Sequence, residues 1–192
     1  RIRIKWVVLG VVVVLFLWLV YALVTTLPFY PAFRKNVGSY EKLQRALEDY
    51  PDMYTANQLE LPFTTNEEYY LILDGRTIYA HPNGYAFGGS LLSNGVEVNY
   101  GMQCDKNEID LSVPDLNYRG IPLKIEIWGP ESGILSHGIS IHFSPGDHYY
   151  SFGAYYDCGT LTEEEMTSLD DTIEPQLLEL IHQVIDNYLD KE

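Results

Sequence analysis

The sequence predicts an α+β fold, in which an N-terminal transmembrane helix precedes an antiparallel sheet domain packed by an N-terminal helix and C-terminal helices. Three observations lead to this prediction. An uncharged apolar run occupies residues 6–27. The hydrophobic pattern of the following segments then changes from a helical period to a period of two, which is typical of strands. Helical spacing returns near the C-terminus, and strands in one block with helices at both ends favour a sheet covered by helices.

The apolar run is long enough to cross a lipid bilayer. As a helix, residues 6–27 would extend about 33 Å, against about 30 Å for the hydrocarbon core. The apolar core of a signal peptide is shorter, about 7–15 residues, and no Ala-x-Ala cleavage site follows this run. We therefore expect an uncleaved anchor that contacts the lipid bilayer through residues 6–27. A cleaved signal peptide and a buried soluble helix are the alternatives.

Basic residues precede the run at Arg1, Arg3 and Lys5, and they favour a cytoplasmic N-terminus. The rest of the chain would then lie outside, as in a single-pass protein of the cell membrane. The predicted organisation has three parts. These are a basic flank with the transmembrane helix over residues 1–27, a juxtamembrane tether over residues 28–38, and an extracytoplasmic α+β domain over residues 39–192.

The part of the chain after the run is strongly acidic. The whole chain has 12 basic and 27 acidic residues, and three of the basic residues but none of the acidic ones precede the run. Nine basic and 27 acidic residues remain, so this part has a formal charge of −18. Nucleic-acid binding needs a basic surface that neutralises phosphates, so no nucleic-acid partner is expected. The 46% of apolar residues argues against a disordered chain.

The first elements of the domain are a helix and several short strands. Ser39 can cap a helix over residues 40–50, where apolar side chains recur at helical spacing. Strands are predicted over four segments: residues 69–73, 77–80, 96–102 and 108–113. The first two of them flank Asp-Gly-Arg, which indicates a hairpin. Residues 84–95 are rich in glycine, and we expect a loop there rather than a phosphate cradle, because residues 83–90 contain no Lys or Arg.

The clearest strand signals lie in the second half of the chain. Residues 121–128 alternate between apolar and polar side chains, and residues 138–143 and 148–156 flank a Ser-Pro-Gly-Asp turn. Pairing across this turn would place four large side chains on one buried face: Ile139, Ile141, Tyr150 and Phe152. His142 and Tyr149 would then share the opposite face.

Two helical segments are expected at the C-terminus. Thr162 and Glu165 match a capping box at the start of the first segment. Pro175 suits the first turn of a second helix that runs to about Leu189.

The two cysteines are candidates for a disulfide. Cys104 and Cys158 would lie outside the membrane, where disulfides persist, and each follows a strand-like segment. A bridge would close a loop of roughly 55 residues and contribute on the order of 4 kcal/mol to stability. Two separate reduced cysteines are the alternative.

Tyrosine is the unusual feature of the composition, with 15 of the chain's 16 tyrosines lying after the apolar run. Adjacent tyrosines on strands leave one ring of each pair pointing away from the core. Rigid amphipathic rings suit a partner surface, whether the partner is a protein or a glycan. We predict that this surface includes Tyr149, His142 and Tyr155. The ordinary preference of tyrosine for strands is the alternative.

No motif identifies a catalytic or metal site, and no cofactor is expected. Gly-x-Ser-x-Gly and His-Glu-x-x-His are both absent. A metal site shared by His137, His142 and His148 is disfavoured, because strand alternation separates His142 from His148. Oxygen-bearing side chains that could form a catalytic pair or bind calcium are better explained as solvated surface: Asp74, Glu126, Asp147, Asp105, Asn107, Glu108 and Asp110.

The sequence therefore predicts a membrane-anchored, extracytoplasmic binding domain whose partner is an envelope protein, a peptide or a glycan. A binding protein is favoured over an enzyme. The alternatives are a small membrane-tethered hydrolase that acts on cell-envelope material and a subunit of a larger membrane complex.

Overall fold

The structure, a computed structural model, describes residues 11–21, 33–50, 53, 59–73, 82–106, 109–130 and 135–190. Residues 11–21 form a helix. The elements that follow are β1 (Phe33–Asn36), α2 (Tyr40–Leu47), β2 (Thr64–Leu73), β3 (Pro82–Ser93), β4 (Val96–Asp105), β5 (Leu116–Tyr118), β6 (Ile121–Trp128), β7 (Ser136–Phe143), β8 (Tyr149–Asp157) and α3 (Glu163–Leu189).

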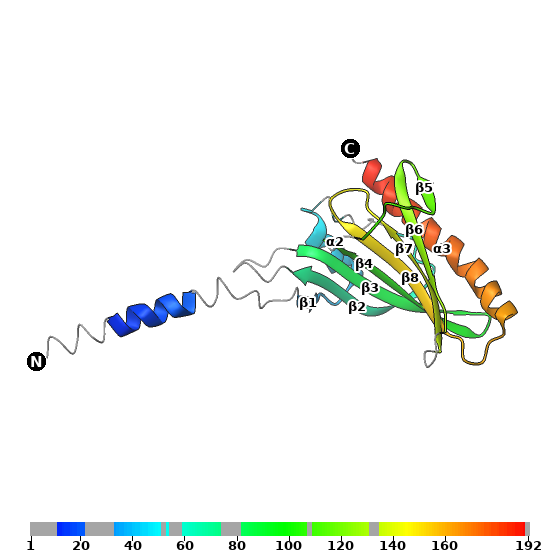
Figure 1. The fold of residues 1–192 in the computed structure, drawn as a ribbon, viewed down its shortest axis with the longest axis horizontal. Helices are drawn as coiled ribbons and strands as arrows, with labels where there is room; N and C mark the ends of the chain where they lie inside the picture. The colour runs from blue at the N-terminus through cyan, green and yellow to red at the C-terminus, as the bar shows by residue number, and fades with distance from the viewer. Residues whose placement is uncertain are drawn as a thin grey trace, which may run out of the picture.

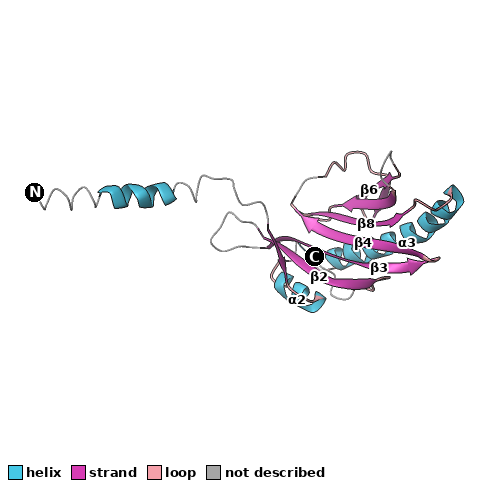
Figure 2. Ribbon diagram, turned by 90° about the horizontal axis from the view of Figure 1, so that it is seen from below, coloured by secondary structure: helices cyan, strands magenta, loops and turns pink. Residues whose placement is uncertain are grey.

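The predicted α+β class is confirmed. All eight strands form one antiparallel sheet in the order β1-β2-β3-β4-β8-β7-β6-β5. The long helix α3 lies along one side of this sheet, as Figure 1 shows and the turned view of Figure 2 confirms. The buried residues of α2, Leu43 and Leu47, belong to the same apolar cluster as those of α3. Both helices therefore cover one face, and we call the opposite face, which carries Gly101, Ser140 and Ser151, the helix-free face.

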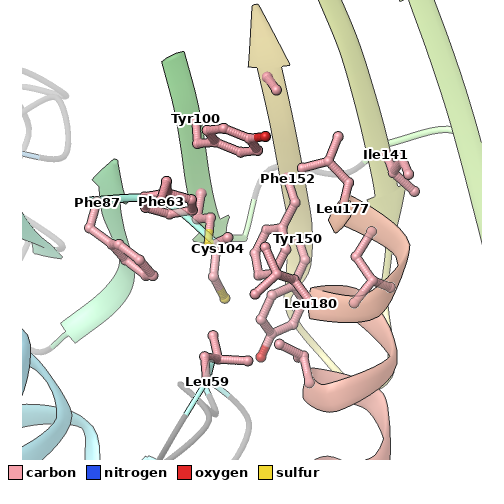
Figure 3. Packing of buried hydrophobic residues seen from close by; sticks show 14 of the residues in the cluster. Leu59, Phe63, Phe87, Tyr100, Cys104, Ile141, Tyr150, Phe152, Leu177 and Leu180 are labelled. Carbon is pink, nitrogen blue, oxygen red and sulfur yellow. The ribbon is translucent and has the colours of Figure 1, made fainter. Parts of the chain in front are cut away.

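The core lies between the sheet and the two helices, and the sheet contributes most of its aromatic side chains. Tyr150 and Phe152 of β8 point toward Leu177 and Leu180 of α3 (Figure 3). Phe143 of β7 stacks on Tyr150, with 4.9 Å between ring centroids, and meets Phe152 edge to face. Aromatic pairs in these geometries add to the stabilisation that burial provides.

The predicted pairing of β7 with β8 is confirmed. Ile141 lies opposite Phe152 and Phe143 lies opposite Tyr150. The four side chains expected inside are fully or almost fully buried: Ile139, Ile141, Tyr150 and Phe152. His142 and Tyr149 are only partly buried and lie on the helix-free face.

The glycine-rich segment is a strand, so the expectation of a loop over residues 84–95 is wrong. Nearly all of it belongs to β3, which pairs with both β2 and β4. The glycines allow neighbouring backbones to approach closely. A Cβ on Gly84 would lie 2.1 Å from the carbonyl oxygen of Cys104, and one on Gly88 would lie 2.5 Å from that of Tyr100. The glycines thus serve the close approach of strands, one of the known roles of glycine inside a strand.

The C-terminal part is one helix, so the expectation of two helical segments is wrong. The capping box is confirmed, since the Thr162 hydroxyl accepts from the Glu165 N–H and the Glu165 carboxylate accepts from the Thr162 N–H. Pro175 lies inside α3, with Ile173 and Leu177 buried on either side of it. Burial of this apolar stripe outweighs the hydrogen bond that the proline removes.

Three other segments differ from the prediction or lie outside the described residues. Residues 33–36, expected in the tether, form β1 and pair with β2. No strand includes residues 109–113; instead Leu116–Tyr118 forms β5 at the edge of the sheet. The predicted strand over residues 77–80 lies outside the described residues, although β2 and β3 pair in the expected antiparallel sense.

The predicted transmembrane helix is described only in part, over residues 11–21. Among the described residues, no helix is both long enough and apolar enough to cross a bilayer. The confirmed part of the fold prediction is therefore the sheet domain with its helices, and the transmembrane helix is not supported by the structure.

Candidate functional site: a groove on the helix-free face

The middle of the helix-free face is built from residues with little or no side chain. Gly88 of β3 lies opposite Gly101 of β4, Gly101 lies opposite Gly153 of β8, and Gly153 lies opposite Ser140 of β7. The row therefore crosses four neighbouring strands at one level. Side chains on the strands to either side project beyond this floor, because successive residues of a strand alternate between the two faces of a sheet.

A groove of about 370 Å³ lies over this floor. Its volume falls in the range of about 300–1,000 Å³ that is common for ligand pockets. The larger side chains around it come from both halves of the sheet: Arg34, Glu68, Tyr70, Gln103, Trp128 and Tyr155. Ligand pockets typically combine aromatic walls with a few polar groups, and this groove has that composition.

One wall is an aromatic pair. The rings of Trp128 on β6 and Tyr155 on β8 lie 6.3 Å apart between centroids, although β7 separates the two strands. Gly138 of β7 makes this contact possible, because a Cβ there would lie 2.3 Å from Cζ2 of the indole. The two residues keep 40% and 47% of their surface exposed. Both rings are therefore positioned by the fold and accessible from the groove.

The other wall is polar. Arg34 of β1 reaches across the sheet and donates a hydrogen bond from Nη2 to Oε1 of Gln103, over 3.3 Å. The amide of Gln103 donates in turn to the carboxylate of Asp105. Among the described residues that line the groove, the charged ones are Arg34 and Glu68. The lining is therefore close to neutral, in contrast to the acidic domain as a whole.

The structure brings one of the three predicted surface residues into the groove. Tyr155 lines it, whereas Tyr149 and His142 lie on the same face without lining it. The His142 imidazole is 13% exposed, and its Nε2 lies 3.4 Å from Oε2 of Glu126. Sequence reasoning missed Trp128. A signal for it existed, because Trp128 occupies a polar-side position of the alternating run that forms β6.

The predicted disulfide is not formed, and both cysteines are free and buried. Cys104 lies opposite Tyr150 at the start of β8, while Cys158 follows the end of β8. Eight residues of extended chain separate Tyr150 from Cys158, so the two cysteines are roughly 26 Å apart. A disulfide needs Cα atoms within about 7 Å. Burial raises the pKa of the Cys104 thiol, so this thiol stays protonated.

The other candidate sites do not converge. No group of three or more His, Cys, Asp or Glu side chains within the described ranges could hold a metal ion. Glu126 lies within β6, while Asp147 lies in the turn between β7 and β8. Of the suggested calcium ligands, Asp105 is buried at the end of β4 and Asp110 accepts from the Ser112 N–H. Asp74, Asn107 and Glu108 lie outside the described residues.

A second polar cluster ties α3 to the sheet. Nε2 of His137 lies 2.8 Å from Oδ2 of Asp170, and the Tyr156 hydroxyl donates to Oδ1 of the same carboxylate over 2.9 Å. Burial is the main cause that raises the pKa of Tyr156, and the hydrogen bond to Asp170 raises this pKa further. The cluster lies on the helix-covered face and links β7 and β8 to α3, so its role is structural.

Comparisons of the chain with protein-family models, with curated proteins and with solved structures find no match.

Proposed function

We propose that this chain is a membrane-anchored binding domain whose ligand occupies the groove on the helix-free face. The observation that carries the proposal is the aromatic pair Trp128–Tyr155, which is positioned over Gly138 yet left exposed. Removal of large aromatic rings from water lowers the free energy, so burial of these rings under a bound partner stabilises the complex.

The anchor would be the apolar segment over residues 6–27, with the basic N-terminus in the cytoplasm and the domain outside. The formal charge of −18 on residues 28–192 supports this arrangement, because it opposes adhesion of the domain to anionic lipid. Protease added to intact cells should then digest the domain. Protection of the domain from protease in intact cells, together with digestion after lysis, would contradict this topology.

A binding function is favoured over a membrane-tethered hydrolase. Among the described residues that line the groove, Glu68 is the one acid and histidine is absent. The acid–histidine pair on this face, Glu126 with His142, is not part of the lining. Hydrolysis by general acid–base catalysis needs such groups within hydrogen-bond reach of the bound substrate.

The groove can be filled without disturbing the sheet. A Cβ on Gly101 meets no atom within 4 Å, so Gly101→Leu should project into the groove. Glu97→Leu is the matched control, because Glu97 is an exposed residue on the same strand and the same face but outside the lining. Full-length wild-type chain and both variants are used for affinity capture from membranes.

The expected result is that wild type and Glu97→Leu retain the same envelope component, whereas Gly101→Leu loses it at an unchanged melting temperature. Equal recovery of that component by Gly101→Leu would overturn the assignment of the groove as the binding site. Failure of the wild type to retain any component would overturn the binding function itself.

A further inference from the structure

We infer that the groove takes a neutral carbohydrate chain, with one sugar ring stacked on the Trp128–Tyr155 pair. The inference rests on the proposed binding function and adds the chemical class of the ligand. It follows from three properties of the groove: its aromatic wall, its charge and the way in which its backbone groups are paired.

The aromatic wall suits a sugar ring. A pyranose presents a face of C–H groups that can lie on an aromatic ring, while its hydroxyls point outward around the edge. Trp128 and Tyr155 offer two exposed rings inclined at 35° to each other. Gln103, Ser140 and Ser151 surround the groove with amide and hydroxyl groups, which can both donate and accept hydrogen bonds, as sugar hydroxyls require.

The charge of the groove excludes polyanions. Arg34 is the one basic side chain among the described lining residues, and it already donates to Gln103. Glu68 offsets it, and residues 28–192 as a whole carry a formal charge of −18. Nucleic acids and acidic polysaccharides would therefore meet repulsion, whereas a neutral chain would not.

The pairing of the strands disfavours an extended peptide. The floor belongs to β3, β4, β8 and β7, and each of these strands is paired on both sides. Their N–H and C=O groups are engaged within the sheet. Recognition of a peptide by strand addition needs the free edge of a sheet rather than its face. The groove presents a floor of already paired backbone, together with side chains and ring faces, which matches a ligand that brings its own hydroxyls.

The chain offers a direct optical test. Its three tryptophans are Trp6, Trp18 and Trp128. In full-length chain with Trp6→Phe and Trp18→Phe, all tryptophan emission comes from the groove. The chain is kept in a detergent without a sugar headgroup, which would otherwise compete. The probes are the hexamers of β-1,4-linked glucose and β-1,4-linked N-acetylglucosamine, followed by an array of neutral oligosaccharides.

We expect a saturable change in Trp128 emission with at least one neutral oligosaccharide. Tyr155→Ala should weaken that binding about tenfold, the scale of one lost ring contact. Gly101→Leu should abolish it, and Glu97→Leu should leave it unchanged. Binding that survives Gly101→Leu would overturn the location.

Two outcomes would overturn the ligand class and separate it from the proposed function. A random peptide library or heparin that binds wild type but not Gly101→Leu, while neutral oligosaccharides do not bind, would remove the carbohydrate inference and leave the groove as a binding site. Absence of binding by all of these probes, combined with no component captured from membranes, would remove both proposals.

Discussion

The indole of Trp128 lies directly over Gly138 of the neighbouring strand, where any side chain would collide with it. A Cβ at position 138 would lie 2.3 Å from the ring and 2.8 Å from the carbonyl oxygen of Ala154. The sheet therefore depends on a glycine at this point to bring a β6 ring into contact with a β8 ring.

Gly138→Ala should destabilise the domain, because neither the indole nor the backbone of Ala154 can move away without loss of packing. Overpacking of this kind typically costs about 1–3 kcal/mol. Gly101→Ala is the control, since its Cβ would meet nothing within 4 Å, and it should be nearly neutral. Urea unfolding of the two variants measures the difference. Equal stability of both would show that Trp128 and the β7–β8 backbone adjust freely at this position.

Phe152→Ala should cost about 3–5 kcal/mol, because the side chain is fully buried between the sheet and α3. Tyr149→Ala, three residues earlier and on the other face, should change stability by no more than about 0.5 kcal/mol. Thermal unfolding of both variants tests the register of β8. The opposite ranking, with Tyr149→Ala the more damaging, would mean that the strand is shifted by one residue.

Both cysteines should be present as free thiols and unreactive in the folded chain. Cys104 has no exposed surface, and burial raises the pKa of its thiol, so the reactive thiolate is suppressed. The Cys158 thiol donates to the carbonyl oxygen of Leu135 over 3.2 Å. A thiol-specific chromogenic reagent, used without reductant, should react with two thiols after unfolding in guanidinium and very slowly before it. Detection of no thiols in the denatured chain would restore the disulfide.

The domain should lose stability as the pH rises above about 10. Burial raises the pKa of Tyr85 and Tyr150 well above that of a free phenol, and it raises the pKa of Tyr100 to about 12. A raised folded pKa means that the folded state holds its proton more tightly than the unfolded chain. The stabilisation is therefore complete below the unfolded pKa of about 10 and is lost as the pH rises through the folded values.

Absorbance at 295 nm, which reports phenolate, tests this prediction alongside circular dichroism. The exposed tyrosines should titrate reversibly near pH 10. The buried ones should ionise only together with loss of the folded signal. Full titration of all tyrosines at pH 10–11 with an intact circular dichroism spectrum would contradict the burial of these three rings. Tyr85→Phe is the matched variant, because it should reduce the alkaline sensitivity.

Local sequence determined the elements whose signals lie within a few residues. Ser39 accepts from the Lys42 N–H at the start of α2, and Thr162 with Glu165 starts α3, as their spacing indicates. The alternation on either side of Ser144–Asp147 determined which faces of β7 and β8 are buried, because a two-residue period leaves only one register that buries the large side chains.

Tertiary structure decided the features whose partners are distant in the chain. Gly84 and Gly88 resemble a loop in sequence, and only the close approach of β4 makes them part of a strand. Pro175 looks like a helix start, but burial of Ile173 and Leu177 against the sheet carries α3 through it. The groove depends most on the fold. Its floor and walls come from segments spread from β1 to β8, and their proximity is set by strand order, which no local pattern encodes.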